Sequence, residues 1–266
     1  MKISVCGKGG CGKSTLVTLL AKELAAMGKR VLVIDTDESN YGLHKQLGVE
    51  LPEDFTAYFG GKQKVLGDMM MSNFTHQFFA TTWGIDDIPA SCSVEKDNII
   101  LMSSGKIHEA NEGCACPMGT LMTQFIDHLT LGPDEYALID MEAGIEHFGR
   151  GTNNGTDLVL MVVDPSFESL RLTGKIKELS ESIDKPIRFV LNKVTPEIRQ
   201  LMRNQVCDDT AIIAELPADG DLMTAGLIGA ELDGGDGALK EAIRQLAVSL
   251  EASRDQFKDS FIADLA

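Results

Sequence analysis

The chain has 266 residues, with 24 Lys and Arg against 40 Asp and Glu, and its formal charge of −16 argues against binding to nucleic acid or to an anionic membrane. We expect one domain over residues 1–266, because no linker divides the chain. No apolar run approaches the ~20 residues of a membrane span, and residues 7–10 interrupt the apolar start before it could form a signal sequence. Six cysteines in such a chain indicate thiols or metal ligands in the cytoplasm rather than disulfides.

The first chemical signal is the stretch GKGGCGKST at residues 7–15, directly after the apolar residues 3–6. It fits the phosphate-loop pattern G-x-x-x-x-G-K-[ST], with Gly7, Gly12, Lys13 and Ser14 at the fixed positions. The preceding apolar run predicts a buried strand, and residues 15–25 predict a helix because apolar side chains recur three and four positions apart. An ordinary glycine-rich turn is the alternative, but these flanks favour a nucleoside triphosphate site.

The residue types of this loop suit a polyphosphate bound with Mg²⁺. Glycines allow a sharp turn that aims backbone N–H groups at phosphate, and the start of the helix adds a partial positive charge. We expect Lys13 to reach the β- and γ-phosphates and to act in catalysis, and the Ser14 hydroxyl to ligate Mg²⁺. The predicted nucleotide contacts in this loop are Gly9, Gly10, Cys11, Gly12, Lys13, Ser14 and Thr15.

Lys8 extends the pattern to KGGxGKST. This resembles the deviant phosphate loop of the SIMIBI class of P-loop NTPases, which includes the MinD/ParA and nitrogenase iron protein ATPases and the metal-centre maturation ATPases. The resemblance implies that Lys8 is catalytic and reaches across a homodimer to the ATP of the partner. The alternative is a solvated surface lysine.

Two carboxylates follow the next predicted strand, Arg30–Asp35 (RVLVID). The carboxyl end of a parallel strand lies at the ligand-binding edge of an open sheet, so Asp35 and Asp37 should lie beside the phosphate loop. We expect Asp35 to belong to the Mg²⁺ shell and Asp37 to orient the attacking water. Either residue could instead cap a helix that begins near Tyr41. In the SIMIBI class, which the phosphate loop resembles, this segment is switch I and usually reads D-x-D followed by proline. Here Glu38 replaces the proline.

Residues 48–98 are the least informative part of the sequence. The apolar residues 68–72 and 74–79 predict helix packed on the sheet, and their methionines indicate packing rather than a metal site. A further strand is expected over residues 98–103.

Cys114 and Cys116 form a C-x-C pair in a glycine-flanked loop before a helix expected at residues 120–131. Two thiols this close can share one metal ion, although two unrelated thiols are the alternative. Because Zn²⁺ takes four ligands, one pair is an incomplete site, and a twofold axis would supply the second pair.

A strand predicted at residues 136–140 ends at Asp140, where a carboxylate of the Mg²⁺ shell is expected to take part in catalysis. Asp140 also begins a D-x-x-[AG]-G stretch that matches switch II, and the Gly144 N–H is placed to sense the γ-phosphate. The alternative is that Asp140 is simply a polar end to the strand.

The stretch EAGIEHFGRG at residues 142–151, together with C-A-C, resembles the CooC group of ATPases. These proteins assist nickel insertion into carbon monoxide dehydrogenase, and a related member serves acetyl-CoA synthase. The resemblance implies that Cys114 and Cys116 of two chains bind Ni²⁺ or Zn²⁺ at the dimer interface, and that Glu146 and His147 lie near the metal or contact a partner. The alternative for His147 is a hydrogen bond within its own loop.

The remaining predicted elements are strands at residues 157–163, 187–191 and 210–216, a helix at Phe167–Ser182 and an acidic amphipathic helix at 237–265. The resemblance implies that Asn192 contacts adenine, with Lys193 and Pro217 beside it. Asn192 could instead cap the strand. The acidic helix should pack on its own sheet through Leu239, Ile243, Leu246 and Leu250 rather than insert into lipid.

These observations predict an α/β, single-domain P-loop NTPase with a mostly parallel central sheet flanked by helices on both faces. We expect an ATP-hydrolysing metallochaperone that binds ATP, Mg²⁺ and Ni²⁺ or Zn²⁺ as a homodimer, with carbon monoxide dehydrogenase or acetyl-CoA synthase as client. One alternative is a reductase with an interfacial [4Fe–4S] cluster, although residues 142–151 lack the cysteine that the nitrogenase iron protein uses there. Another is a positioning or partition scaffold without metal chemistry.

Overall fold

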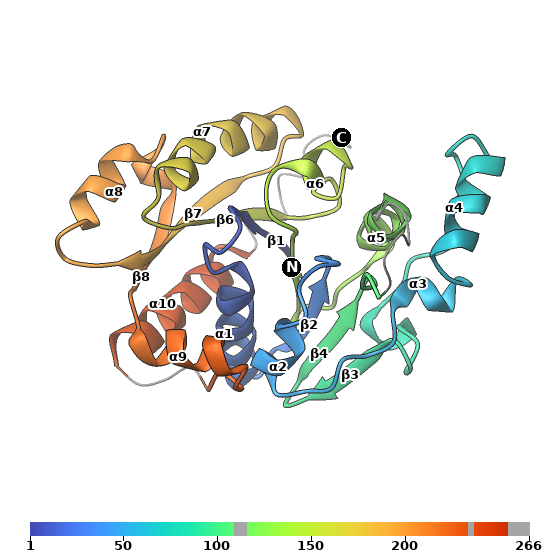
Figure 1. Ribbon diagram of the computed structural model, residues 1–266, viewed down its shortest axis with the longest axis horizontal. Helices are drawn as coiled ribbons and strands as arrows, with labels where there is room; N and C mark the ends of the chain where they lie inside the picture. Colours follow the sequence, from blue (N-terminus) through green and yellow to red (C-terminus); the bar gives the residue numbers. More distant parts are fainter. Residues whose placement is uncertain (109–115, 234–236, 255–266) are drawn as a thin grey trace.

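The computed structural model describes residues 1–108, 116–233 and 237–254, and within them eight strands form one sheet (Figure 1). The strand order is β3-β4-β2-β5-β1-β6-β7-β8. Neighbouring strands are parallel except for β3 and β4, which are antiparallel. The strands are β1 (Lys2–Gly7), β2 (Arg30–Asp35), β3 (Ser93–Lys96), β4 (Ile99–Ser103), β5 (Glu135–Asp140), β6 (Leu158–Val163), β7 (Ile187–Val194) and β8 (Ile212–Pro217).

Helices lie on both faces of the sheet, as predicted. The described helices are α1 (Lys13–Ala26), α2 (Leu43–Leu47), α3 (Phe55–Tyr58), α4 (Lys62–Met71), α5 (Cys116–His128), α6 (Glu146–Gly149), α7 (Phe167–Ser182), α8 (Arg199–Gln205), α9 (Gly220–Ile228) and α10 (Ala238–Ala252). Two short 3₁₀ turns lie at Ile85–Asp87 and Asp209–Ala211.

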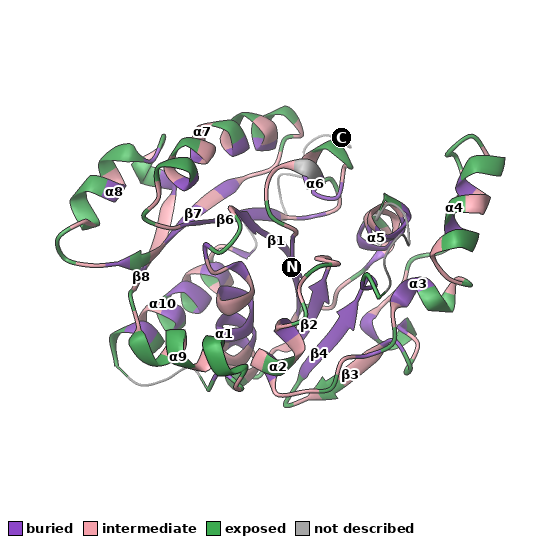
Figure 2. Cartoon of the chain, viewed as in Figure 1, coloured by how far each residue is buried: buried purple, intermediate pink, exposed green. Residues whose placement is uncertain are grey.

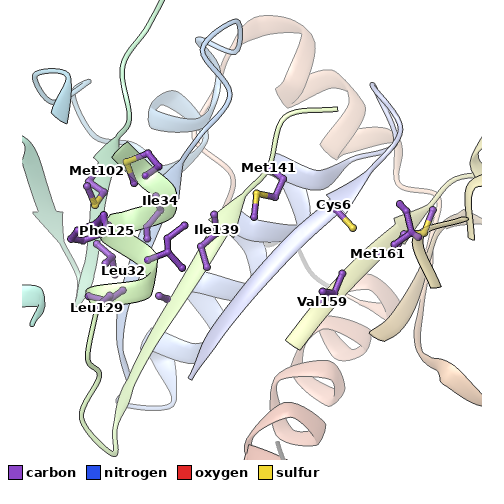
Figure 3. Close-up of a cluster of buried hydrophobic side chains, with 14 of the residues drawn as sticks. Cys6, Leu32, Ile34, Met102, Phe125, Leu129, Ile139, Met141, Val159 and Met161 are labelled. Atoms are coloured by element: carbon purple, nitrogen blue, oxygen red, sulfur yellow. The ribbon is translucent and has the colours of Figure 1, made fainter. Parts of the chain in front are cut away.

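The central strands are buried on both faces because their side chains are apolar at successive positions. In β2, Leu32 and Ile34 belong to one core cluster, whereas Val31 and Val33 belong to the other. The first cluster packs against α5, α7 and α8, and the second against α1, α2 and α10. Figure 2 shows the buried strands between exposed outer helix faces, and Figure 3 shows Phe125 of α5 among the side chains of the first cluster. The fold class is therefore confirmed.

Three predicted helices differ from the structure. Residues 74–79 form no helix, because Asn73 and Phe74 take left-handed backbone conformations (φ 52° and 63°) that end α4 at Met71. The described part of helix α5 starts at Cys116, four residues before the predicted start at Thr120, and Pro117 is compatible with the first turn of a helix. The described part of the last helix ends at Ala252, and residues 255–266 lie outside the described residues.

The strand order reverses at β1. The chain leaves β1 for β2 on one side of it, and β6 to β8 follow on the other side. The carboxyl ends of β1, β2 and β5 therefore meet at a topological switch point, which is where open parallel sheets bind ligands.

Candidate nucleotide-binding and hydrolysis site

The phosphate loop connects β1 directly to α1. Gly10 and Gly12 have φ angles of 77° and 103°, and a Cβ on Gly12 would overlap the Asn192 side-chain amide, so this turn requires glycine. Lys13 begins α1 and is only 8% exposed. Its Nζ donates to the Lys8 carbonyl at 3.3 Å, inside the curve of the loop. The loop thus holds one ammonium and the start of a helix where the sequence predicts phosphate.

Two strand-end carboxylates lie beside the loop. Asp35 and Asp140 are register partners on β2 and β5, and both are buried. The Ser14 hydroxyl donates to Asp140 Oδ2 at 2.6 Å, and Asn40 Nδ2 donates to Ser14 Oγ at 2.9 Å. Asp140 Oδ1 is buried and has no hydrogen-bond partner within the described residues. A hydroxyl, two carboxylates and one unsatisfied buried oxygen fit a Mg²⁺ ion, which prefers oxygen ligands.

Burial and mutual repulsion set the electrostatics of these two carboxylates. Burial, followed by the neighbouring Asp35 charge, raises the pKa of Asp140 to about 7. Burial also raises the pKa of Asp35 to about 6, although the Lys106 ammonium opposes that change. The two carboxylates repel each other when both are ionised, so the site favours a bound cation.

Replacing Asp140 by Asn is expected to stabilise the metal-free protein at high pH. The folded-state pKa of Asp140 lies above its ordinary value of 3.8, so the folded protein binds the proton more tightly than the unfolded chain does. This carboxyl therefore costs stability as pH rises from about 4 to 7. In EDTA at pH 8, Asp140→Asn should raise the free energy of unfolding by up to about 4 kcal/mol, and the gain should fade toward pH 4.

Denaturant unfolding at several pH values measures this effect. Glu168→Gln is the matched control, because Glu168 is 78% exposed and its substitution should leave the pH profile unchanged. An Asp140→Asn protein that is less stable than the wild type at pH 8 would contradict the assignment of this buried charge.

Lys106 is a site residue that the sequence analysis missed. Its side chain is fully buried, and its Nζ lies 2.6 Å from both Asp35 Oδ2 and the Asp37 carbonyl oxygen. The available signal was its position: it follows β4, the parallel neighbour of β2, so it reaches the same edge of the sheet.

The two predicted switch segments follow β2 and β5, which lie on the same side of β1 in the sheet. Asp37 is partly exposed, and its Oδ1 accepts bonds from Ser39 N at 3.0 Å and Ser39 Oγ at 2.6 Å. Gly144, with a φ of 100°, donates its N–H to the Gly7 carbonyl at 3.3 Å. The predicted γ-phosphate sensor is thus in direct contact with the first residue of the phosphate loop.

A pocket of about 430 Å³ adjoins the loop, and the residues predicted to contact the nucleotide base lie in its wall. Asn192 Nδ2 donates to the Cys11 carbonyl at 2.8 Å, and Lys193 Nζ donates to the Gly10 carbonyl at 2.8 Å. Both residues belong to β7, which runs past the predicted end at residue 191. The pocket residues from the sequence prediction are Gly10, Gly12, Thr15, Asn192, Lys193 and Pro217. Of the other predicted loop contacts, Cys11 is buried in the core and Gly9 lies next to Ala143.

Lys8 turns toward α7 in this chain. Its Nζ lies 3.4 Å from Ser166 Oγ and 3.6 Å from Glu168 Oε2, and its side chain is 36% exposed. A partly exposed pair of this kind contributes little stability, so Lys8 is readily released to another partner.

The predicted cysteine pair is only partly described. Cys116 is exposed in the first described turn of α5, whereas Cys114 lies outside the described residues. Cys116 is disulfide-bonded in this structure, so the prediction of a free thiol at this position is wrong for the form described. Within residues 1–108, 116–233 and 237–254, no group of three or more His, Cys, Asp or Glu side chains is arranged to hold a metal ion. The imidazole of His147 is buried, which disfavours the predicted partner contact, and the Glu146 side chain lies outside the described part.

The edge of the sheet has the arrangement of a P-loop nucleotide-binding protein. The family model of the CobQ/CobB/MinD/ParA nucleotide binding domain matches residues 3–231, and the chain belongs to this family.

Relatives over nearly the whole chain agree with that assignment. The chain is 46% identical to an uncharacterised ATP-binding protein of Methanocaldococcus jannaschii, over 92% of this chain and 99% of that protein. It is 34% identical to the carbon monoxide dehydrogenase accessory protein CooC of Rhodospirillum rubrum, over 86% of this chain and 88% of that protein. The predicted ATPase activity and the resemblance to CooC are thereby confirmed.

Solved structures show the same fold. The septum site-determining protein MinD of Pyrococcus horikoshii, solved with Mg-ADP, has a TM-score of 0.64 and 18% identity over 94% of this chain and 95% of that chain. MinD of Aquifex aeolicus has a TM-score of 0.61 and 22% identity over 94% and 96%. Among the described helices of the present chain, none has the length and apolar character needed to cross a membrane.

Proposed function

We propose that the chain is an ATP-hydrolysing maturation factor whose nucleotide-dependent homodimer binds Ni²⁺ or Zn²⁺ through Cys114 and Cys116 of each chain. Its client would be carbon monoxide dehydrogenase or acetyl-CoA synthase, into which it supports nickel insertion. The observation that carries the proposal is the 34% identity to CooC over 86% of the chain, combined with the C-A-C stretch.

The residues at the sheet edge divide the work of hydrolysis. Lys13 and the loop N–H groups bind the phosphates, Asp37 orients the attacking water, and Lys8 of the partner chain completes the site. Asn192, Lys193 and Pro217 hold the base. Ser14, Asp35 and Asp140 would hold Mg²⁺, which neutralises charge on the phosphates when bound.

Contacts of switch II support a link between the nucleotide and the metal. Glu142 forms an ion pair with Arg150, and a Cβ at Gly119 of α5 would lie 3.1 Å from the Arg150 side chain. Helix α5 begins with Cys116, so a displacement of switch II after hydrolysis would push on the helix that carries a metal ligand. ATP would favour the closed dimer with four thiolates around one ion, and hydrolysis would release the metal as cargo.

Removing both thiols is expected to abolish metal binding. Anaerobic equilibrium dialysis with Ni²⁺ and Zn²⁺, combined with size measurement, should give one metal per two chains and a dimer that depends on nucleotide. The states compared are nucleotide-free, ADP and non-hydrolysable ATP. The Cys114→Ser, Cys116→Ser double variant should lose the metal, because a hydroxyl is a far weaker ligand than a thiolate.

Cys207→Ser is the matched control, because Cys207 is an exposed free cysteine on the described surface. Unchanged metal stoichiometry in the double variant would refute the proposed ligands. A brown protein that retains iron and sulfide in anaerobic preparations would instead favour the reductase with an iron–sulfur cluster.

A further inference from the structure

Two chain segments that are far apart in sequence are joined at the sheet edge. One is the switch I segment, residues 35–41, and the other is the β4 exit segment, residues 104–108. The Ser104 N–H donates to the Asp35 carbonyl at 2.9 Å, and the Ile107 N–H donates to the Glu38 carbonyl at 3.2 Å. The Tyr41 hydroxyl donates to the Ile107 carbonyl at 2.6 Å. Hydrogen bonds therefore run along the length of both segments, two between backbone groups and one from the Tyr41 side chain.

The Lys106 side chain crosses between the two segments at the centre of these contacts. It is fully buried, and its Nζ binds both the Asp35 carboxylate and the Asp37 carbonyl at 2.6 Å. The Tyr41 ring covers the same ammonium, with its centroid 5.8 Å from Nζ. Separating a buried ammonium from its carboxylate is costly, because it leaves both charges without compensation. The β4 exit segment must therefore follow Asp35 and Asp37 when they move.

Lys106 lies close in sequence to Cys114, one of the predicted metal ligands. Asp35 and Asp37 are the switch I carboxylates of the proposed hydrolysis site, and Lys106 precedes Cys114 by eight residues (114 − 106). Lys106 was not needed for any step of hydrolysis proposed above. Its contacts are instead with the residues that sense nucleotide and Mg²⁺.

We propose that Lys106 is a positioning residue that makes the β4 exit segment follow switch I, so that nucleotide state reaches the stretch of chain that carries Cys114. The consequence for metal binding rests on the proposed function, but the coupling between the two segments does not. This route through switch I is separate from the contact of Arg150 with α5.

Amide hydrogen exchange, followed residue by residue by NMR, tests the coupling without any metal cargo. In the wild type, exchange at Ser104 and Ile107 should change by roughly fivefold or more, together with residues 37–40, between the EDTA state and the state with Mg²⁺ and non-hydrolysable ATP. In Lys106→Met, switch I should still respond while Ser104 and Ile107 do not. Lys175→Met, at an exposed lysine of α7, is the matched control and should behave as the wild type.

Two results would overturn the proposal: a wild-type protein in which switch I responds and Ser104 and Ile107 do not, or a Lys106→Met protein that responds as the wild type does. If Lys106→Met does not fold, the test uses Tyr41→Phe instead, because this variant removes only the hydrogen bond from the Tyr41 hydroxyl to the Ile107 carbonyl. A reduced response at Ile107 then supports the coupling, and an unchanged response opposes it.

Metal titration distinguishes this proposal from the proposed function. Where the wild type binds Ni²⁺ or Zn²⁺ with an affinity that depends on nucleotide, that dependence should be weaker in Lys106→Met, because only the separate contact of Arg150 with α5 remains. A wild type that binds neither ion in any nucleotide state refutes the proposed function, and the exchange data alone then decide on Lys106.

Discussion

Lys13→Ala is expected to abolish nucleotide binding, with the ATP affinity lowered at least about a hundredfold. The Lys13 ammonium bonds within the phosphate loop and the residue is only 8% exposed, so its charge is poorly screened by water and acts strongly on a bound phosphate. Its present bond is to the Lys8 carbonyl at 3.3 Å, a weak acceptor that a phosphate oxygen would displace. Calorimetric titration with ATP and Mg²⁺ measures the loss directly.

Lys22→Ala supplies the control for this experiment. Lys22 lies on the same helix, but its ammonium pairs with Glu231 at 2.7 Å, away from the phosphate loop. Its removal should leave ATP affinity within about twofold of the wild type, because a partly exposed ion pair contributes little to structure. A Lys13→Ala protein that binds ATP within tenfold of the wild type would show that another group carries the phosphate contact.

The central part of the fold could be predicted because its signals are local. The apolar runs of β1, β2 and β5 are long enough to be buried on both faces, which predicts parallel strands. β1 leads into the phosphate loop, whereas β2 and β5 end in the carboxylates Asp35 and Asp140. The edge rule for parallel sheets then placed Asp35 and Asp140 next to Ser14, and the structure brings these three together. A local motif and one topological rule were sufficient for this part of the site.

The parts that could not be predicted depend on contacts between distant residues or on local backbone conformations. The β3–β4 hairpin was missed, although its turn residues Asp97 and Asn98 both have positive φ, the conformation of a two-residue hairpin turn. An Asp-Asn pair is a weaker signal than Asp-Gly or Asn-Gly. Lys106 was missed because its role depends on β4 lying beside β2, which no pattern around residue 106 contains.

The position of the Lys8 side chain predicts a large effect of its removal on ATP hydrolysis. In the single chain it lies near Ser166 and Glu168, at 3.4 Å and 3.6 Å, where it does not serve the chain's own phosphate loop. Lys8→Ala is therefore expected to bind ATP as the wild type does but to lose hydrolysis by a factor of about a hundred or more, as expected for loss of a cation that stabilises phosphoryl transfer. Steady-state phosphate release and nucleotide titration measure the two quantities separately. Glu168→Ala is the control, because it frees Lys8 without removing it, and it should retain hydrolysis.

Mixing two inactive variants distinguishes a lysine that acts across a dimer from one that acts within its own chain. Asp37→Asn should also bind ATP without hydrolysing it, because it would lose the carboxylate that we propose orients the attacking water. In a mixed dimer, the Asp37→Asn chain supplies Lys8 to the Lys8→Ala chain, whose own Asp37 is intact, so one of the two sites is complete. Random pairing of equal amounts makes half of the dimers mixed, and the mixture should recover about a quarter of the wild-type rate. A lysine acting within its own chain leaves both sites of the mixed dimer defective, so a mixture as inactive as its components would exclude action across the interface.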